Sequence, residues 1–367
     1  MRSPAVLARY TRCGPRPSCV TRATGLDSAG ENPETFARGT HTPAIVRVLC
    51  AGHVNWDVTL RVDALPSPDG EARVHDRRES GGGSAANCAS VLATLGVETG
   101  VHGSVGSDSR GRQARRELVD AGVEVAPLVE TDVGTATKYL VVDPAGRVMV
   151  LGDDRGNEAF TAADLPDDVL PAVEHVHVTG QRSGRACELV RLAREHGASV
   201  SVDPGRRASE RAFEPVLAAA DYLFFTADEA RQVGIDPDDP ADHGDWPGDG
   251  GALDPTEGRV VLIKAGPDGA RLRSPAGEAT HDGFEVDPEN TTGAGDAFAA
   301  GFLASVLTDW RPVSGIGTRG VPDGTAVERR RRALVVAEAC GAIATRRDGA
   351  RVHLSRGDVE RFLRERA

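Results

Sequence analysis

The chain has 367 residues and a formal net charge of −12, from 43 lysine and arginine residues against 55 aspartate and glutamate residues. Only Lys138 and Lys264 are lysines, and neither follows a glycine, so a Walker-A loop of the form GxxxxGK[ST] is excluded. The negative charge argues against nucleic acid as the main partner. No apolar run approaches the about 20 residues that span a bilayer, so we expect no membrane partner.

The six cysteines form no CxxC pair, so the sequence indicates neither a zinc site nor a disulfide framework. We therefore expect a reduced, cytoplasmic protein. An excess of acidic residues with almost no lysine is also typical of halophilic proteins, although GC-rich coding would favour arginine over lysine in the same way.

Residues 1–44 differ from the rest of the chain. They combine several arginines with scattered proline and glycine and show no periodic apolar face. We expect either a disordered extension or a start site assigned too far upstream, with the folded domain at 45–367.

From residue 45 onward, apolar strands alternate with helical patterns. The first strand is predicted at 45–52, and the amphipathic strands 57–62 and 71–78 follow, joined by a turn at 66–70. A Gly-rich turn then opens a helix at about 85–95. Further strands are predicted at 97–103, 134–142, 145–151, 174–179, 198–203, 221–225 and 259–265, with hairpin pieces at 270–286, and further helices at 109–121, 184–196, 227–232, 296–308 and 327–346.

This order of elements predicts an α/β fold with a mainly parallel central sheet and helices on both faces, a three-layer sandwich. Two strand pairs, near 57–78 and 134–151, lie outside the alternation and predict a small β-sheet lid. Residues 235–258 are rich in Asp, Gly and Pro and are expected to form a surface insertion.

The strongest motif is Asn290-Thr-Thr-Gly-Ala-Gly-Asp296, which precedes an apolar helix. Small residues with a GxG step allow successive backbone N–H groups to point at one spot, and a helix N-terminus adds partial positive charge. Asp296 would stand at the mouth of this anion hole, where it could accept the proton of an attacking hydroxyl. The alternative is an ordinary glycine turn with Asp as helix cap.

A second motif, Gly81-Gly-Gly-Ser-Ala-Ala-Asn87, satisfies the GxGxxG/A dinucleotide fingerprint. The segment before it is too polar for a buried parallel strand, and no acidic residue closes the following strand. A turn that lets a polyol approach the backbone, with Asn87 as hydrogen-bonding partner, fits better.

The two motifs together resemble the signatures of the ribokinase/PfkB family of carbohydrate kinases, over about residues 45–352. The resemblance implies a ribokinase-like α/β sandwich with a β lid that transfers the ATP γ-phosphate to a sugar hydroxyl. It implies that Asp296 is the catalytic base and that Gly293, Ala294 and Gly295 form the anion hole. It also implies that the sugar is bound by Asn55, Asp57, Gly82, Gly83 and Asn87.

Looser matches extend the resemblance to the residues that would bind ATP, the phosphate donor. Lys264, Gly266, Gly269 and Thr292 would bind the nucleotide, and the helix from 337 to 345 would wall the adenine. Glu229, in Thr226-Ala-Asp-Glu229, matches the acidic residue linked to Mg²⁺, although Thr226 replaces an asparagine. Asn290 replaces an aspartate near the family's monovalent-cation site, so K⁺ is a weaker expectation.

The acceptor is less defined than the reaction. Arg182, Arg185, Arg206 and Arg207 follow predicted strand ends and would suit a phosphorylated substrate, but arginine clusters arise easily in a chain this rich in arginine. The neutral sugars and nucleosides (pentose, hexose or nucleoside) are therefore the expected acceptors, with a sugar phosphate such as ribose 1-phosphate as the alternative. A non-catalytic sugar or nucleotide sensor and a nicotinamide-dependent oxidoreductase are the rival classes, and a homodimer through the lid is the expected assembly.

Overall fold

The computed structural model describes residues 46–153, 156, 158–237, 258–312, 325–347, 349 and 351–366. The predicted extension 1–44 lies outside the described residues, and so does nearly all of the predicted insertion at 235–258. The domain boundary near residue 45 and these two assignments therefore stay predictions.

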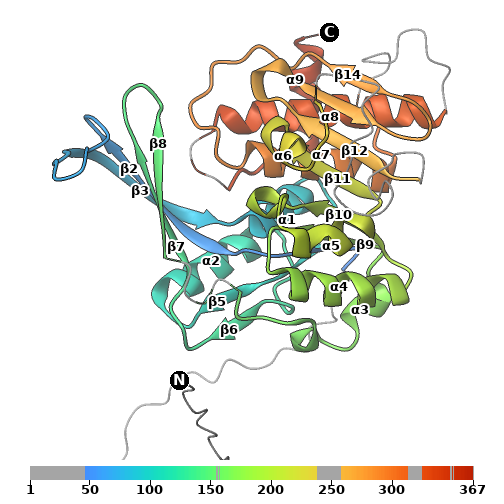
Figure 1. Ribbon diagram of the computed structural model, residues 1–367, viewed down its shortest axis with the longest axis horizontal. Helices are drawn as coiled ribbons and strands as arrows, with labels where there is room; N and C mark the ends of the chain where they lie inside the picture. The colour runs from blue at the N-terminus through green and yellow to red at the C-terminus, as the bar shows by residue number, and fades with distance from the viewer. Residues whose placement is uncertain are drawn as a thin grey trace, which may run out of the picture. The chain divides into compact units, whose positions relative to one another are not determined.

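A central sheet of eight strands runs through the described part of the chain in the order β14-β13-β12-β11-β10-β9-β1-β4 (Figure 1). Its parallel strands are β1 (Val48–Ala51), β4 (Thr99–His102), β9 (His175–Thr179), β10 (Ser199–Asp203), β11 (Tyr222–Thr226) and β12 (Val260–Lys264). Two antiparallel strands, β13 (Ala270–Arg273) and β14 (Ala279–His281), complete one edge. The predicted mainly parallel sheet is confirmed.

Alternate side chains of the central strands enter two separate cores. In β1, Val48 and Cys50 belong to one hydrophobic cluster, while Leu49 and Ala51 belong to the other. Because successive side chains of a strand point to opposite faces, a strand covered on both sides must be apolar throughout. This accounts for the continuous apolar runs of β1, β11 and β12, whereas β9 and β10 alternate valine with buried histidine or with serine.

Helices cover both faces of this sheet, as predicted. The first core receives residues of α1 (Ser84–Thr94), α2 (Ser109–Asp120), α7 (Ala294–Thr308), α8 (Ala326–Thr345) and α9 (Arg356–Arg364). The second receives residues of α3 (Val169–Ala172), α4 (Ser183–Glu195), α5 (Glu214–Ala218) and α6 (Ala227–Gln232). Short 3-10 turns occur at η1 (Ala162–Asp164), η2 (Gly205–Arg207), η3 (Arg211–Phe213) and η5 (Gly266–Asp268). Among the described helices, none is long and apolar enough to cross a bilayer.

The two predicted strand pairs form a second sheet, which we call the lid. It consists of β2 (Asn55–Val62), β3 (Val74–Gly82), β7 (Thr137–Val142) and β8 (Val148–Asp153) in the order β3-β2-β7-β8. β2 pairs in parallel with β7, and the outer strands are antiparallel. Figure 1 shows it as a blue and green ribbon beside the helices. A small third sheet joins β5 (Ser104–Gly106) to β6 (Val129–Thr131).

Helix α9 was not predicted: the last helix expected from the sequence ended at residue 346. Its start does carry a sequence signal: Ser355 and Asp358 form a reciprocal capping box. On its buried face, Val359, Phe362 and Leu363 join the first core, so the end of the chain contributes to the domain's packing.

Candidate active site

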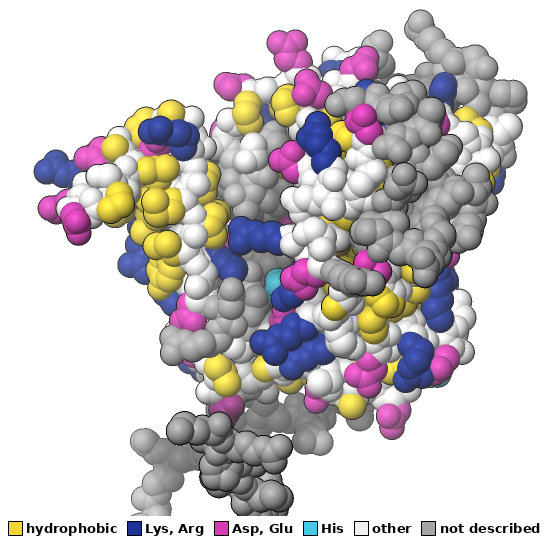
Figure 2. Space-filling model, viewed as in Figure 1, with side chains coloured by type: hydrophobic (Ala, Val, Ile, Leu, Met, Phe, Trp, Pro, Cys, Tyr) yellow, Lys and Arg dark blue, Asp and Glu magenta, His cyan; other side chains and the backbone are white. Residues whose placement is uncertain are grey.

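A cavity of about 930 Å³ lies between the lid and the carboxyl ends of the central strands, and we call it the lid cavity. In open α/β sheets these strand ends are where sites form, because the loops that follow them converge there. The lid cavity is lined by His53, Asn55, Asp57, Gly83, Ser84, Asn87, Val133, Lys138, Leu140, Val150, Gly156, Glu158, Ala159, Gly180, Arg182, Arg185, Asp203, Pro204, Gly205, Arg206, Arg207, Glu210, Glu229, Thr292, Gly293 and Asp296. Figure 2 shows basic side chains and a histidine in the hollow between the lid and the rest of the domain.

A second cavity, of about 890 Å³, lies on the other side of the α7 N-terminus, and we call it the helix cavity. Its walls come from the end of β12, the segment between β14 and α7, and one face of α8. Its lining includes Thr226, Asp228, Lys264, Gly266, Gly269, Asp282, Phe284, Glu285, Val286, Pro288, Ala294, Gly295, Phe298, Glu338, Gly341, Ala342 and Thr345. The start of α7 thus borders both cavities.

Asp296, the predicted base, lies in the first turn of α7 and borders the lid cavity. Its Oδ2 accepts a hydrogen bond of 2.9 Å from Nδ2 of Asn87 in α1. Burial raises the pKa of Asp296 to about 7, and Asp203 adds to this, while Asn87, Lys264 and Ser84 act in the opposite direction. A carboxyl with a pKa near neutrality is suited to accept a proton from a hydroxyl.

The N-terminus of α7 has the geometry of an anion site. Gly293 precedes the helix in the left-handed conformation, with φ of 80°, and no side chain caps the first turn. Upstream, the amide of Thr292 donates to Oδ1 of Asn290 over 2.9 Å, which holds the turn in shape. Uncapped N–H groups and the positive end of the helix dipole favour a bound anion. Gly293 and Thr292 line the lid cavity, whereas Ala294 and Gly295 line the helix cavity.

Lys264 ends β12 and forms an ion pair of 2.6 Å with Asp203 at the end of β10. Burial alone would lower the pKa of Lys264, but Asp203, together with Glu229 and Asp296, raises it above its ordinary value. The lysine therefore stays charged between the two cavities. Gly266 and Gly269, the other predicted residues of this turn, both line the helix cavity.

The predicted sugar-binding side chains meet on the lid side. Asn55, Asp57 and Asn87 are all buried, and in each the Oδ1 atom has no hydrogen-bond partner in the described part of the chain. Buried polar atoms are normally paired, so three unpaired oxygens around one cavity indicate a polar ligand. Burial raises the pKa of Asp57 to about 6, although Arg351 and Lys138 oppose this.

Gly82 and Gly83 leave the space that neighbouring groups of this site occupy. A Cβ at Gly82 would collide with the carboxylate of Asp57, and one at Gly83 would collide with the carbonyl of His53. Gly83 also has φ of 96°, which disfavours any other residue. Gly83 lines the lid cavity, while Gly82 acts through the position of Asp57.

Glu229, the predicted metal-linked residue, lines the lid cavity but already has a structural partner. Its Oε2 accepts from the amide of Thr226 over 2.8 Å, and the Thr226 hydroxyl accepts from the Glu229 amide, which is a capping box at α6. The described residues contain no cluster of three or more His, Cys, Asp or Glu side chains placed to hold a metal ion. Any Mg²⁺ here would therefore need ligands from a bound phosphate, which is the usual arrangement for this ion.

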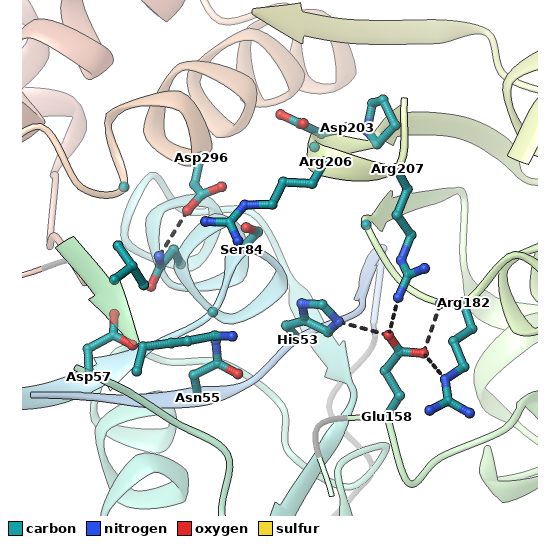
Figure 3. A pocket seen from close by; sticks show the side chains of 18 of the residues that line it. His53, Asn55, Asp57, Ser84, Glu158, Arg182, Asp203, Arg206, Arg207 and Asp296 are labelled. Carbon is teal, nitrogen blue, oxygen red and sulfur yellow. Dashed lines mark hydrogen bonds and ion pairs between the residues drawn. The ribbon is translucent and has the colours of Figure 1, made fainter. Parts of the chain in front are cut away.

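Sequence reasoning missed the network centred on Glu158, which Figure 3 shows beside the lid cavity. Glu158 Oε1 lies 3.1 Å from Nε2 of His53 and accepts a bond of 3.1 Å from Arg207, while Oε2 accepts one of 2.8 Å from the Arg182 amide. A lone Glu in an irregular segment carries no sequence signal. Ser84 and Asp203, which border the same cavity, were also not singled out.

This fold and site define a phosphotransferase of the ribokinase type, with a candidate base and anion site between an acceptor cavity and a donor cavity. The chain belongs to the pfkB family of carbohydrate kinases, whose family model matches residues 46–355. The predicted family, fold class and reaction class, ATP-dependent phosphorylation of a hydroxyl, are thereby confirmed. The relatives are sugar and nucleoside kinases, which favours a kinase over the two rival classes, a non-catalytic sensor and a nicotinamide-dependent enzyme.

Individual relatives agree with this placement. The chain is 45% identical over 331 residues to the ATP-dependent ribose-1-phosphate kinase of Halopiger xanaduensis, covering 88% of this chain and 99% of the relative. It is 26% identical to the nucleoside kinase of Methanothermobacter thermautotrophicus, covering 71% and 82%. The ribokinase structure from Giardia lamblia superposes with a TM-score of 0.71 at 17% identity, covering 88% of this chain and 100% of that one, which shows the shared fold.

Proposed function

We propose that this protein transfers the γ-phosphate of ATP to a hydroxyl of ribose 1-phosphate. The observation that carries the proposal is the set of four arginines that borders the lid cavity together with Asp296. A neutral sugar or nucleoside would leave Arg185 and Arg206, the two arginines of this set that form no ion pair among the described residues, without a counterpart. The 45% identity to a ribose-1-phosphate kinase over almost the whole relative supports the same acceptor.

The four arginines come from two adjacent strand ends. Arg182 and Arg185 follow β9, and Arg206 and Arg207 lie in the turn after β10. Glu158 fixes two of them, since it pairs with Arg207 and Arg182. Arg207 also pairs with Glu210, which lines the same cavity, so two carboxylates lie among the four guanidinium groups. Arg185 and Arg206 remain to meet a phosphate dianion.

Arg185 and Arg206 are the strongest candidates for direct phosphate contact. Nη1 of Arg185 is buried and has no hydrogen-bond partner among the described residues. Arg206 makes no ion pair within the described part of the chain, and Figure 3 shows it extended toward Ser84 and Asp296. A phosphate held by these two residues would lie in the same cavity as the candidate base.

The proposed reaction is an in-line transfer with Asp296 as the base. Asp296 takes the proton of an acceptor hydroxyl while that oxygen bonds to the γ-phosphorus, and the bond from this phosphorus to the bridging oxygen of ADP breaks. Negative charge on the transferred group is stabilised by the N–H groups of residues 293–295 and by Lys264. The acceptor is held by Asn55, Asp57 and Asn87.

The site residues support a role for Mg²⁺ more than one for K⁺. When bound with ATP, Mg²⁺ would neutralise phosphate charge, and Glu229 and Asp203, two of the carboxylates on the cavity wall, would hold it through water. At the position near the monovalent-cation site where an aspartate was expected, this chain has Asn290. Its Oδ1 already accepts a hydrogen bond from the amide of Thr292. We therefore propose Mg²⁺ dependence and only weak stimulation by K⁺.

The lid is proposed to close over the acceptor and to pair two chains. Lys138, Leu140 and Val150 of the lid border the cavity, so closure would exclude water from the reacting phosphate. On the lid, Val74, Val148 and Leu151 are each about half exposed, at 49%, 48% and 55%. Val74 lies on one edge strand of the lid and Val148 and Leu151 on the other, and exposed apolar side chains of this kind are suited to association. Loss of a dimer in a Leu151→Asp variant, measured by light scattering after gel filtration, would support this pairing.

An acceptor panel tests the proposed function. ADP release is measured with ATP and, in turn, ribose, fructose, adenosine, ribose 1-phosphate and ribose 5-phosphate, at low and high KCl. We expect ribose 1-phosphate to be the preferred acceptor, and high salt to support activity if the acidic composition reflects a salt-rich cytoplasm. A preference for adenosine or for a neutral sugar would contradict the proposed acceptor, ribose 1-phosphate. It would instead support the neutral acceptor that the sequence predicts.

A further inference from the structure

The helix cavity contains one ionisable side chain that the proposed chemistry does not use. Glu338 lies on the face of α8 that carries Gly341, Ala342 and Thr345, at the helical spacing that brings these residues to one wall. It is 7% exposed. Apolar side chains also line this cavity, among them Phe284, Val286, Pro288 and Phe298.

Among the described residues, no side chain or backbone group pairs with the Glu338 carboxyl. Other buried charges on the same helix are paired: Arg332 contacts Glu328 at 2.5 Å and Asp309 at 3.0 Å. An unpaired carboxyl in an apolar wall costs stability, so packing does not explain its presence. Its position on the cavity surface indicates that a ligand completes its hydrogen bonds.

The charged groups around Glu338 are paired with other residues or exposed to solvent. Those that line the same cavity are Lys264, paired with Asp203, Asp228, paired with Arg231, and the exposed Asp282 and Glu285. At the end of β14, the His281 ring lies against Phe284, tilted by 50° with centroids 4.6 Å apart. None of them contributes to the pKa of Glu338, which burial alone raises to about 7.

We propose that Glu338 binds the Watson–Crick edge of the donor's adenine and so sets the preference for ATP. This rests on the proposed function, because it requires the phosphates of ATP at the start of α7 and the base in the helix cavity. The protonated carboxyl offers both groups that adenine needs: its carbonyl oxygen accepts from the 6-amino group, and its O–H donates to N1.

Ionisation changes which base fits. A carboxylate has only acceptors, so it repels N1 of adenine, but it can accept from both N1–H and the 2-amino group of guanine. The ratio of ATP affinity to GTP affinity should therefore fall as pH rises through the pKa of Glu338. Effects of pH on the phosphates or on Asp296 are common to both nucleotides and cancel in this ratio.

Isothermal titration calorimetry of ATP and GTP, in the absence of acceptor, tests the proposal at pH 6 and pH 8.5. For the unmodified protein we expect the ratio of the two affinities to fall by about 10-fold or more between these pH values, because one hydrogen bond is exchanged for a repulsion. Glu338→Gln keeps an amide donor and acceptor at every pH, so its ratio should not change. Glu338→Leu should lower ATP affinity by about 2- to 10-fold at pH 6.

Glu285→Gln is the matched control, since it removes an exposed carboxyl from the same cavity. Its ATP to GTP ratio should keep the pH dependence of the unmodified protein. A ratio that is independent of pH in the unmodified protein, or ATP affinity unchanged in Glu338→Leu, would overturn the proposal. Binding is measured without turnover, so an absence of kinase activity would count against the proposed function alone.

Discussion

Asn87 and Asp296 are joined by a hydrogen bond of 2.9 Å although they lie 209 positions apart in the chain. Asn87 belongs to the helix that follows the lid strand β3, and Asp296 to the first turn of α7. The amide of Asn87 donates, so it orients the carboxylate and lowers its pKa against the stronger effect of burial. The contact joins the candidate acceptor site to the candidate base.

Replacing Asp296 by Asn should remove the base and keep this contact, because the amide oxygen of Asn still accepts from Asn87. We expect kcat to fall by about 100- to 10,000-fold, the usual contribution of a general base. The KM for ATP and for the acceptor should change little. Steady-state kinetics of the purified variant measure both quantities.

The same variant should be more stable than the unmodified protein at alkaline pH. Since the pKa of Asp296 is raised to about 7 in the folded state, its ionisation destabilises the fold as pH rises. Asp296→Asn should therefore raise Tm by a few degrees at pH 8 and by less at pH 5. Lost activity together with higher Tm would exclude unfolding as the cause, whereas near-normal turnover would remove Asp296 from the mechanism.

Activity should depend on pH through two carboxyl groups. The base must be ionised, so kcat/KM should fall about tenfold per pH unit below the pKa of Asp296, which is near 7. Asp57, with its pKa raised to about 6, should steepen the fall below pH 6, because we propose that its carboxylate accepts a hydrogen bond from the sugar. A pH–rate profile between pH 5 and 9 measures this, and a flat profile would contradict both assignments.

Arg185→Gln and Arg206→Gln should weaken binding of the phosphorylated acceptor. Loss of one charge-assisted hydrogen bond costs about 1.5–3 kcal/mol, so KM for ribose 1-phosphate should rise about 10- to 150-fold. The KM for ATP should not change. Arg191→Gln serves as control, since Arg191 pairs with Glu195 on the surface of α4. Equal effects in the control and the test variants would place the acceptor's phosphate elsewhere.

Gly82→Ala should disturb acceptor binding through Asp57. The added Cβ would collide with the Asp57 carboxylate, so that side chain must move, at a cost of about 1–3 kcal/mol for a forced shift. We expect a higher KM for the acceptor and a lower Tm. Gly184→Ala is the control, because a Cβ there meets no atom within 4 Å; thermal denaturation and kinetics of the two variants should differ clearly.

Much of this fold could be predicted from the sequence, because its signals are local. Apolar runs such as 221–225 identified buried strands, and the glycine motifs at 81–87 and 290–296 identified two helix starts. The lid followed from strand pairs that break the alternation with helices. Helix α9 was missed although Ser355 and Asp358 carry its capping signal.

The site was only partly predictable, because its decisive contacts connect distant segments. The sequence does not show that Asp203 pairs with Lys264, 61 positions away. Nor does it show that Glu158 gathers His53, Arg182 and Arg207 at one point. The sequence alone does not show that four arginines border the cavity that contains Asp296. Only their position in the fold makes them an argument for a phosphorylated acceptor.

The most direct test of the account is ³¹P NMR of the protein with ATP, Mg²⁺ and ribose 1-phosphate, beside a matched sample with ribose. We expect one ADP and one pentose bisphosphate to form for each ribose 1-phosphate consumed, with much slower phosphorylation of ribose. Unchanged ribose 1-phosphate, in a sample whose enzyme phosphorylates ribose or a nucleoside, would contradict the claim that the arginine wall selects a sugar phosphate.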